Sequence, residues 1–224
     1  MSKPCLVIGA GGHSRVVIEI LREEQNKLYS IEGILDPSFN LLVSEKILDI
    51  PVIGSDSQMR EFFDKGIETA FIAIGNNLKR KELYIALKTI GFQMPNLYSS
   101  FGVIINKTSK IGEANLFCPQ SFIGPLVSIG NNNIFNTKST VEHETIIGSH
   151  NHFAPGSILC GRSKIGSNTF LGAGSITIDS ISIGDNIVIG AGGVVVADLT
   201  GPIGGDTQIQ QDVFVGVPVK KVRR

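Results

Sequence analysis

A histidine between two acidic residues stands in the segment Val141-Glu142-His143-Glu144. Histidine titrates close to neutral pH, so its neutral ring can take a proton from an attacking amine or hydroxyl. A carboxylate that is hydrogen-bonded to the other ring nitrogen orients the imidazole and raises its basicity. The pair His143 and Glu144 therefore predicts general-base chemistry. The alternative is a solvated surface histidine beside two glutamates.

A glycine-rich turn near the start of the chain is the second feature that can do chemistry. The apolar run at residues 5–8 leads into Gly9-Ala10-Gly11-Gly12-His13-Ser14, and apolar residues at helical spacing follow. A strand, a glycine turn and a helix in this order leave free N–H groups that point at an anion. Ser14 takes the place of the third glycine of the dinucleotide fingerprint, and ordinary turn chemistry is the alternative reading.

Two further polar turns follow predicted strands in this half of the chain. Asp36 comes directly after residues 29–35, and Gly75 lies in Ile74-Gly75-Asn76-Asn77 after a strand at 70–74. Only three or four strands fit before the repeats described next, so a complete dinucleotide fold does not. The spacing predicts half of one, which suits a mononucleotide better than NAD.

A six-residue repeat dominates the second half. Ile-Gly pairs begin at residues 111, 129, 147, 165 and 183, an interval of 18. Steps of six from Ile105 to Val195 meet sixteen positions, of which only Thr177 is not apolar. Helices repeat at 3.6 residues and flat strands at 2, so neither explains this period. The repeat predicts a β-helix of about five coils, each with three short strands. A purely structural solenoid is the alternative.

His152 lies nine residues after His143, which is half of one coil. Half a coil turns the chain to a different face, so one chain cannot direct both histidines into one pocket. Neighbouring chains in a cyclic trimer can. A packing role is the alternative for His152. Small residues recur 18 positions apart in Gly172-Ala173-Gly174 and Gly190-Ala191-Gly192, where a ligand can approach the backbone or a tight corner can form.

Together these motifs resemble the hexapeptide-repeat acyltransferases, whose β-helix is left-handed. The nearer resemblance is to bacterial sugar O- and N-acetyltransferases of the sialic-acid-synthesis type. It extends from residue 4 to residue 220 and rests on the glycine turn, on Ile74-Gly75-Asn76-Asn77 with Arg80, and on residues 139–156. Well-understood relatives of this type acetylate the 4-amino group of a UDP-linked amino sugar, and others act on GDP-linked amino sugars.

The resemblance implies a role for each motif residue. It makes His143 the proton acceptor and Glu144 the residue that tunes it. It places acetyl-CoA against His152, Ala173 and Ala191, with Lys220 near its phosphates. The residues that it implies for the nucleotide sugar are Gly11, Gly12, His13, Asp36 and Gly75. Pro37 stands where relatives often carry a second acidic residue, which leaves the base and the sugar open.

Composition excludes several other classes of protein. Twenty Lys and Arg balance twenty Asp and Glu, so no net field attracts nucleic acid or an anionic membrane. Three cysteines without a Cys-x-x-Cys pair indicate neither a disulfide framework nor a structural zinc site. The apolar run after Met1 is too short for a signal peptide or a membrane span, which favours a cytoplasmic location.

We therefore expect α/β plus all-β architecture. A small Rossmann-like βαβ domain that binds a nucleotide sugar occupies residues 1–98, and a left-handed parallel β-helix occupies 99–200. A loop and tail at 201–224, with a Gly- and Gln-rich insertion at 201–211, close the CoA site. The expected activity is acetyl-CoA-dependent N-acetylation of a UDP- or GDP-linked amino sugar by a metal-free homotrimer. The alternatives are O-acetylation of sialic or a related nonulosonic acid, and a non-catalytic nucleotide-sugar-binding scaffold.

Overall fold

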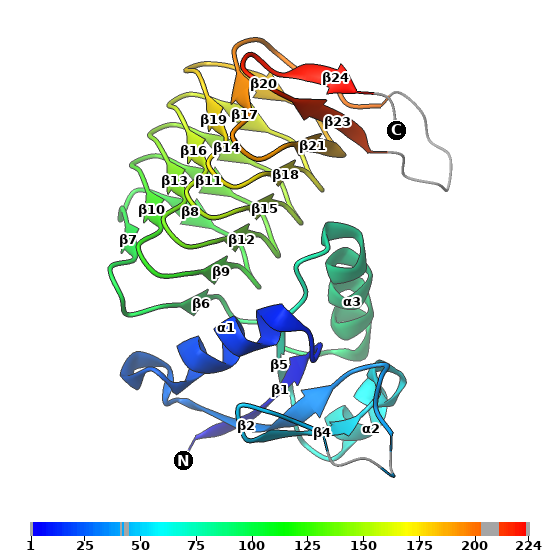
Figure 1. The fold of residues 1–224 in the computed structure, drawn as a ribbon. Coiled ribbons are helices and arrows are strands. Elements are labelled where there is room, and N and C mark those ends of the chain that lie inside the picture. Colours follow the sequence, from blue (N-terminus) through cyan, green and yellow to red (C-terminus); the bar gives the residue numbers. More distant parts are fainter. Residues whose placement is uncertain (1, 41, 43–44, 203–210, 223–224) are drawn as a thin grey trace. The chain divides into compact units, whose positions relative to one another are not determined.

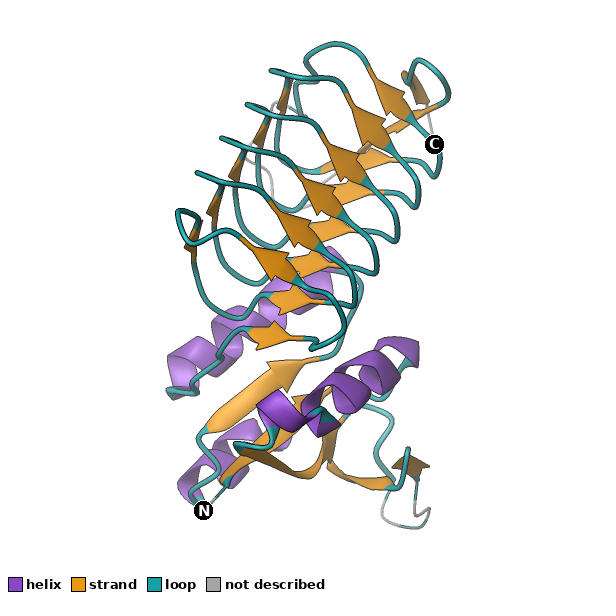
Figure 2. Cartoon of the chain, turned by 90° about the vertical axis from the view of Figure 1, so that its left-hand side faces the viewer, coloured by secondary structure: helices purple, strands orange, loops and turns teal. Residues whose placement is uncertain are grey.

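The computed structural model describes residues 2–40, 42, 45–202 and 211–222, and the chain divides into two compact units, Met1–Ser100 and Phe101–Arg224. The first unit mixes helices and strands, whereas the second is a stack of coils made of short strands (Figure 1, Figure 2). Among the described residues, no helix is long and apolar enough to cross a membrane. The three cysteines are free thiols. Most of the predicted insertion, residues 203–210, lies outside the described ranges.

The described strands of the first unit form a five-stranded sheet with the order β3-β4-β2-β1-β5, in which the β3–β4 pairing is antiparallel and the other pairings are parallel. The β3–β4 hairpin was not predicted. The elements of this unit are β1 (Lys3–Ile8), α1 (Gly12–Arg22), η1 (Glu24–Asn26), β2 (Tyr29–Leu35), β3 (Lys46–Ile47), β4 (Ile50–Gly54), η2 (Asp56–Gln58), α2 (Met59–Asp64), β5 (Thr69–Ile72), α3 (Asn77–Ile90) and β6 (Leu97–Tyr98).

Local sequence explains where the two longer helices begin and end. Helix α1 starts after Gly11 and buries the apolar side of its helix, including Val17 and Leu21. Helix α3 is capped by Asn76, whose side chain accepts a hydrogen bond from the Lys79 N–H at 3.0 Å. It ends at Gly91, whose φ of 117° suits glycine. The helices thus start at the carboxyl ends of β1 and β5.

The second unit is a parallel β-helix with three faces, and among its described strands only β24 runs antiparallel, to β23. The first face contains β7 (Ile104–Ile105), β10 (Phe122–Ile123), β13 (Thr140–Val141), β16 (Ile158–Leu159), β19 (Ile176–Thr177) and β22 (Val194–Val195). The second face contains β8 (Lys110–Ile111), β11 (Ser128–Ile129), β14 (Ile146–Ile147), β17 (Lys164–Ile165) and β20 (Ser182–Ile183). In this unit the third face contains β9 (Leu116–Phe117), β12 (Ile134–Phe135), β15 (His152–Phe153), β18 (Phe170–Leu171), β21 (Ile187–Ile189), β23 (Asp212–Val215) and β24 (Lys220–Val222).

The period of six is confirmed as the pattern of the core. Every sixth residue from Phe117 to Val195 is at most 4% exposed. The rings of Phe117, Phe135 and Phe153 stack with centroids 4.9 Å apart. Thr177, the one polar member, is fully buried, and its hydroxyl accepts a hydrogen bond from the Cys160 N–H at 3.1 Å. A buried hydroxyl with a partner costs little in such a core.

Corners recur with the same period. At every sixth position from Ala114 to Gly192 the backbone φ is positive, between 55° and 68°. The corner between the second and third faces also holds a buried column of polar side chains, which we call the asparagine ladder: Asn115, Asn133, Asn151 and Thr169. Each asparagine Oδ1 accepts the N–H of the next member at 2.7–2.9 Å. The ladder therefore fixes the register from coil to coil.

Candidate active site

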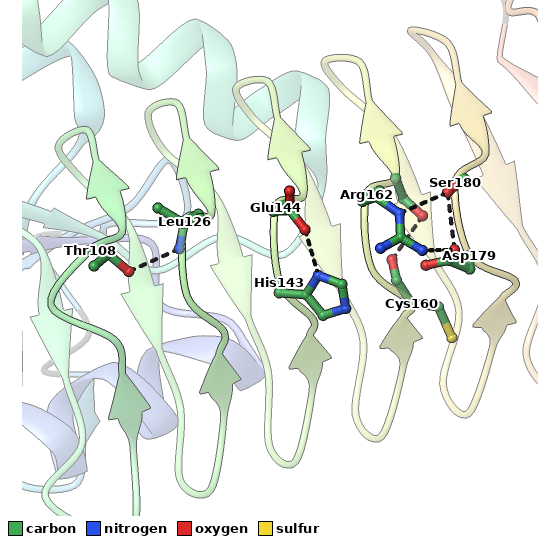
Figure 3. A network of polar contacts seen from close by, with 9 residues as sticks. Thr108, Leu126, His143, Glu144, Cys160, Arg162, Asp179 and Ser180 are labelled. Carbon is green, nitrogen blue, oxygen red and sulfur yellow. Dashed lines mark hydrogen bonds and ion pairs between the residues drawn. The ribbon is translucent and has the colours of Figure 1, made fainter.

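His143 and Glu144 lie on the corner that joins β13 to β14 (Figure 3). Val141 is fully buried, so the two residues after it are carried to the outside of the coil. The His143 Nδ1 and a Glu144 carboxylate oxygen are 3.0 Å apart. The His143 side chain is 41% exposed and that of Glu144 is 50% exposed. Because the carboxylate can only accept, Nδ1 is the donor in this contact, and the neutral form of the ring then has its lone pair on Nε2.

The coil that follows leaves room for the ring at Gly161. A Cβ at Gly161 would lie 2.6 Å from the His143 Nε2 and 2.7 Å from Cε1. Gly161 stands 18 residues after His143, so the two occupy equivalent corner positions on neighbouring coils. The absence of a side chain at Gly161 therefore allows the imidazole to lie over the next coil.

On the next coils, the same corner carries three hydrogen-bonded residues that the sequence analysis missed: Arg162, Asp179 and Ser180 (Figure 3). The Arg162 guanidinium donates to the Asp179 carboxylate, and its Nε donates to the Ser180 hydroxyl at 3.2 Å. The Ser180 hydroxyl donates to Asp179, which lowers the pKa of that carboxyl; contacts with Arg162 and the charge of His143 lower it further. The spacing of 18 residues from His143 and Glu144 was the signal that could have revealed these positions.

His152 lies apart from this corner, in β15 on the third face. Its side chain is buried, with Nε2 3.3 Å from the Asn136 amide nitrogen and its ring edge-on to Phe170 at 5.2 Å. Within one chain, His143 and His152 therefore belong to different faces. His150 lies on a corner, with its Nδ1 2.9 Å from the Asn132 amide nitrogen.

Ala173 and Ala191 are exposed on consecutive coils of the corner that joins the third face to the first. A Cβ at Gly172 would lie 2.5 Å from the Ala191 N, so these coils require glycine for their close approach. The tail continues beside the last coil, because the Val219 N–H donates to the Val194 carbonyl at 2.9 Å. Lys220 follows as an exposed residue at the start of β24. Ala191 and Lys220 are thus carried by neighbouring segments.

In the first unit, Asp36 is tied to the glycine turn. The Ala10 N–H donates to one carboxylate oxygen at 2.7 Å, and the Ser38 N–H and hydroxyl donate to the other. Burial raises the pKa of Asp36, but these hydrogen bonds outweigh it, so the net shift is downward. The carboxylate therefore stays charged and holds β2 against the turn that precedes α1.

Gly11, Gly12 and His13 form the start of α1. The helix has no side-chain cap at Gly11 and no acidic residue in its first turn, so its N-terminus remains favourable to an anion. Burial, and next the charge of Arg80, lower the pKa of His13 to about 4. His13 is therefore neutral at physiological pH.

Gly75 lies in the turn between β5 and α3. This turn touches the glycine turn, since a Cβ at Gly9 would lie 2.8 Å from the Ile74 side chain. The structure thus brings Gly75, Asp36 and the start of α1 to one edge of the sheet, where parallel strands end. Among the described residues, no group of three His, Cys, Asp or Glu side chains is arranged to hold a metal ion.

Comparisons with known proteins agree with both units. Residues 5–87 match the PglD N-terminal domain, and residues 163–197 match the hexapeptide repeat of succinyl-transferase. A comparison with curated proteins finds no match.

Solved structures match over nearly the whole chain. PerB from Caulobacter crescentus, in complex with CoA and GDP-perosamine, is 30% identical with a TM-score of 0.87, over 98% of this chain and 97% of that one. A mutant GDP-perosamine N-acetyl transferase from the same organism, with the same two molecules, is 29% identical with a TM-score of 0.88, over 99% and 97%. The acetyltransferase domain of PglB from Neisseria gonorrhoeae is 25% identical with a TM-score of 0.86, over 99% and 100%.

The resemblance predicted from the motifs is confirmed by these matches, and so is the left-handed β-helix. The match to the PglD N-terminal domain lies in the first unit, the match to the hexapeptide repeat lies in the second, and the solved structures cover both. The chain is an acyltransferase and belongs to the family of sugar acetyltransferases that join a PglD-type N-terminal domain to a left-handed β-helix of hexapeptide repeats.

Proposed function

We propose that this protein transfers the acetyl group of acetyl-CoA to the amino group of a nucleotide-linked amino-deoxy sugar. The observation that carries the proposal is the exposed His143–Glu144 pair, 3.0 Å apart, on a chain that matches GDP-perosamine N-acetyl transferase over 99% of its length. That enzyme was solved with CoA and GDP-perosamine. The nucleotide of this protein's own substrate is either UDP or GDP.

His143 is the general base of the proposed reaction. Its Nε2 takes a proton from the amine as the nitrogen bonds to the acetyl carbon, and the carbon–sulfur bond of the thioester breaks. The proton then passes to the departing sulfur, so CoA leaves as the thiol and no covalent enzyme intermediate forms. Glu144 holds Nδ1–H and stabilises the imidazolium that exists between the two proton transfers. Binding both substrates in alignment supplies much of the rate enhancement.

The first unit is the proposed site for the nucleotide sugar. The start of α1, at Gly11, Gly12 and His13, is the positive end of a helix dipole without an acidic residue in its first turn, which suits a pyrophosphate. One Asp36 oxygen accepts a single hydrogen bond in the structure and has a lone pair left for a ribose or base donor. Gly75, which has no side chain, lies in a second turn at the same edge of the sheet.

The small-residue corner of the β-helix is the proposed site for acetyl-CoA. Ala173 and Ala191 are exposed and carry only a methyl group, so a pantetheine arm can approach the coil closely there, and Lys220 offers a charge to phosphate. His152 lies one coil earlier, near the same corner. The chemistry of these residues fits a long, polar ligand with an anionic end.

A homotrimer completes this proposal, because His143 and His152 lie on different faces of one chain. On the first face, the residue before each buried position pairs in register with its equivalent on the next coil, and all but one of these residues are apolar. We call them the apolar row: Ile104, Phe122, Ile158, Ile176 and Val194, interrupted by Thr140. The equivalent positions of the second face are mostly polar: Lys110, Ser128, Ile146, Lys164 and Ser182.

When the β-helices of three chains turn their first faces to a common axis, corners of neighbouring chains come together. The corner after the first face, with His143, then lies beside the next chain's corner before its first face, with Ala173 and Ala191. This arrangement puts the base of one chain at the donor site of its neighbour. The cytoplasmic location stays a prediction.

The test supplies acetyl-CoA with a panel of UDP- and GDP-linked amino sugars and follows thiol release. We expect turnover on at least one sugar, and a decrease in kcat of about 10²–10⁴ for His143→Ala. His150→Ala, which removes a histidine from a different corner of the coil, serves as the control. Activity only on free nonulosonic acids would replace N-acetylation by O-acetylation. Equal rates for His143→Ala and wild type would remove His143 from its role.

A further inference from the structure

Arg80 is a buried cation that the proposed reaction does not use. It lies in the first turn of α3, is 1% exposed, and is among the largest fully buried side chains of the chain. Moving a guanidinium out of water is costly unless its donors are well placed. A cation held inside a small domain therefore calls for a reason beyond packing.

Three hydrogen bonds of the Arg80 guanidinium converge on one turn. One terminal nitrogen donates to the Ile74 carbonyl at 3.2 Å and to the Gly75 carbonyl at 3.1 Å. The other donates to the Asn77 side-chain oxygen at 2.8 Å. The planar fork of the guanidinium can hold both a backbone carbonyl and a side chain at fixed angles, which a lysine cannot.

The turn at residues 74–77 also contacts the glycine turn that precedes α1. The Ile74 side chain fills the space that a Cβ of Gly9 would need, at 2.8 Å, and the Ala73 N–H donates to the Ile8 carbonyl at 2.8 Å. The charge of Arg80 also lowers the pKa of His13, after the larger effect of burial. Arg80 is thus linked to the ends of both β1 and β5 from inside the domain.

We propose that Arg80 is a positioning residue of the nucleotide-sugar site, which fixes the turn at residues 74–77 against the glycine turn and so sets the place of Gly75. This inference rests on the proposed function, because it takes that edge of the sheet as the nucleotide site. Arg80 itself does not touch the ligand. Its loss weakens binding of the nucleotide part and leaves the β-helix chemistry intact.

The test compares Arg80→Met with wild type by calorimetric titration of UDP, GDP and CoA into the full-length protein. We expect the Kd of the preferred nucleoside diphosphate to rise at least about tenfold, with the Kd of CoA unchanged. In turnover, KM for the nucleotide sugar rises while kcat changes less than twofold. A general loss of structure would instead change CoA binding and kcat together.

Two further variants keep the experiment decisive. Lys79→Met removes the same charge from an exposed position of the same helix, where Lys79 pairs with Asp56 at 3.6 Å, and it should bind nucleotide like wild type. If Arg80→Met does not fold, Asn77→Ser removes the acceptor of the 2.8 Å bond while keeping the cation, and it should weaken nucleotide binding about threefold.

The outcomes separate this inference from the proposed function. Wild type that binds neither UDP nor GDP overturns the assignment of the nucleotide site itself, and the inference with it. Wild type that binds, together with Arg80→Met or Asn77→Ser variants that bind equally well, overturns the role of Arg80 alone.

Discussion

At the residue scale, the position of the His143 imidazole depends on a residue without a side chain. Gly161 has no positive φ, so alanine is compatible with its backbone, but a Cβ there would lie 2.6 Å from Nε2. We expect Gly161→Ala to displace the ring and to lower kcat about 10–100-fold, with little change in KM for either substrate. Steady-state kinetics measure this directly.

Gly148→Ala is the matched control for this prediction. Its Cβ would crowd the Ser167 hydroxyl and the Gly166 carbonyl at 2.6 and 2.7 Å, and it lies on another corner away from the histidine. The control therefore carries at least as much local crowding, since its Cβ also meets backbone atoms of Gly166, whereas the atoms nearest to the Cβ of Gly161→Ala all belong to the His143 ring. Equal losses of activity in the two variants would show that strain in the coil, and not ring position, explains the effect.

At the element scale, the asparagine ladder fixes the register of each coil relative to the next coil. The Asn133 side chain accepts the Asn151 N–H at 2.8 Å and donates to the Gly148 carbonyl at 3.1 Å, and Asn133 is fully buried. Asn133→Leu leaves these backbone groups without partners, so the free energy of unfolding should fall by about 2–5 kcal/mol in denaturant titration.

Asn133→Thr tests whether the hydrogen bonds carry this effect. Thr169 holds the fourth position of the ladder in the same way, with its hydroxyl donating to the Gly184 carbonyl at 2.9 Å and lying 3.3 Å from the Ile187 N. We expect the threonine variant to lose about 1 kcal/mol. A leucine variant as stable as the threonine variant would contradict the proposed role of the ladder.

At the scale of the whole molecule, the apolar row on the first face predicts self-association. Wild type should sediment at about three times the 24.0 kDa chain mass. Ile176 in that row is 39% exposed, and Ile176→Asp should shift the protein toward monomer and abolish turnover, because each site needs two chains. Ser182→Asp, on the second face, should remain trimeric and active. A monomeric wild type with full activity would rule out the shared site.

The sequence by itself determined the β-helix, because one inward side chain per strand imposes the period of six from Ile105 to Val195. It also indicated the strand, glycine turn and helix of the first unit. Both patterns are local or strictly periodic, so they can be read along the chain. The His143–Glu144 contact was predictable for the same reason, since the two residues are adjacent.

Only the tertiary structure decided which side chains meet across elements. The bond from Ala10 to Asp36 joins residues 26 apart, and the fork of Arg80 is visible only once α3 is packed. The period of 18 does align His143, Gly161 and Asp179, yet it does not say that the ring lies over the glycine or that Arg162 turns to Asp179. Rotamers and hydrogen-bond partners depend on the three-dimensional surroundings of each residue, which the repeat leaves open.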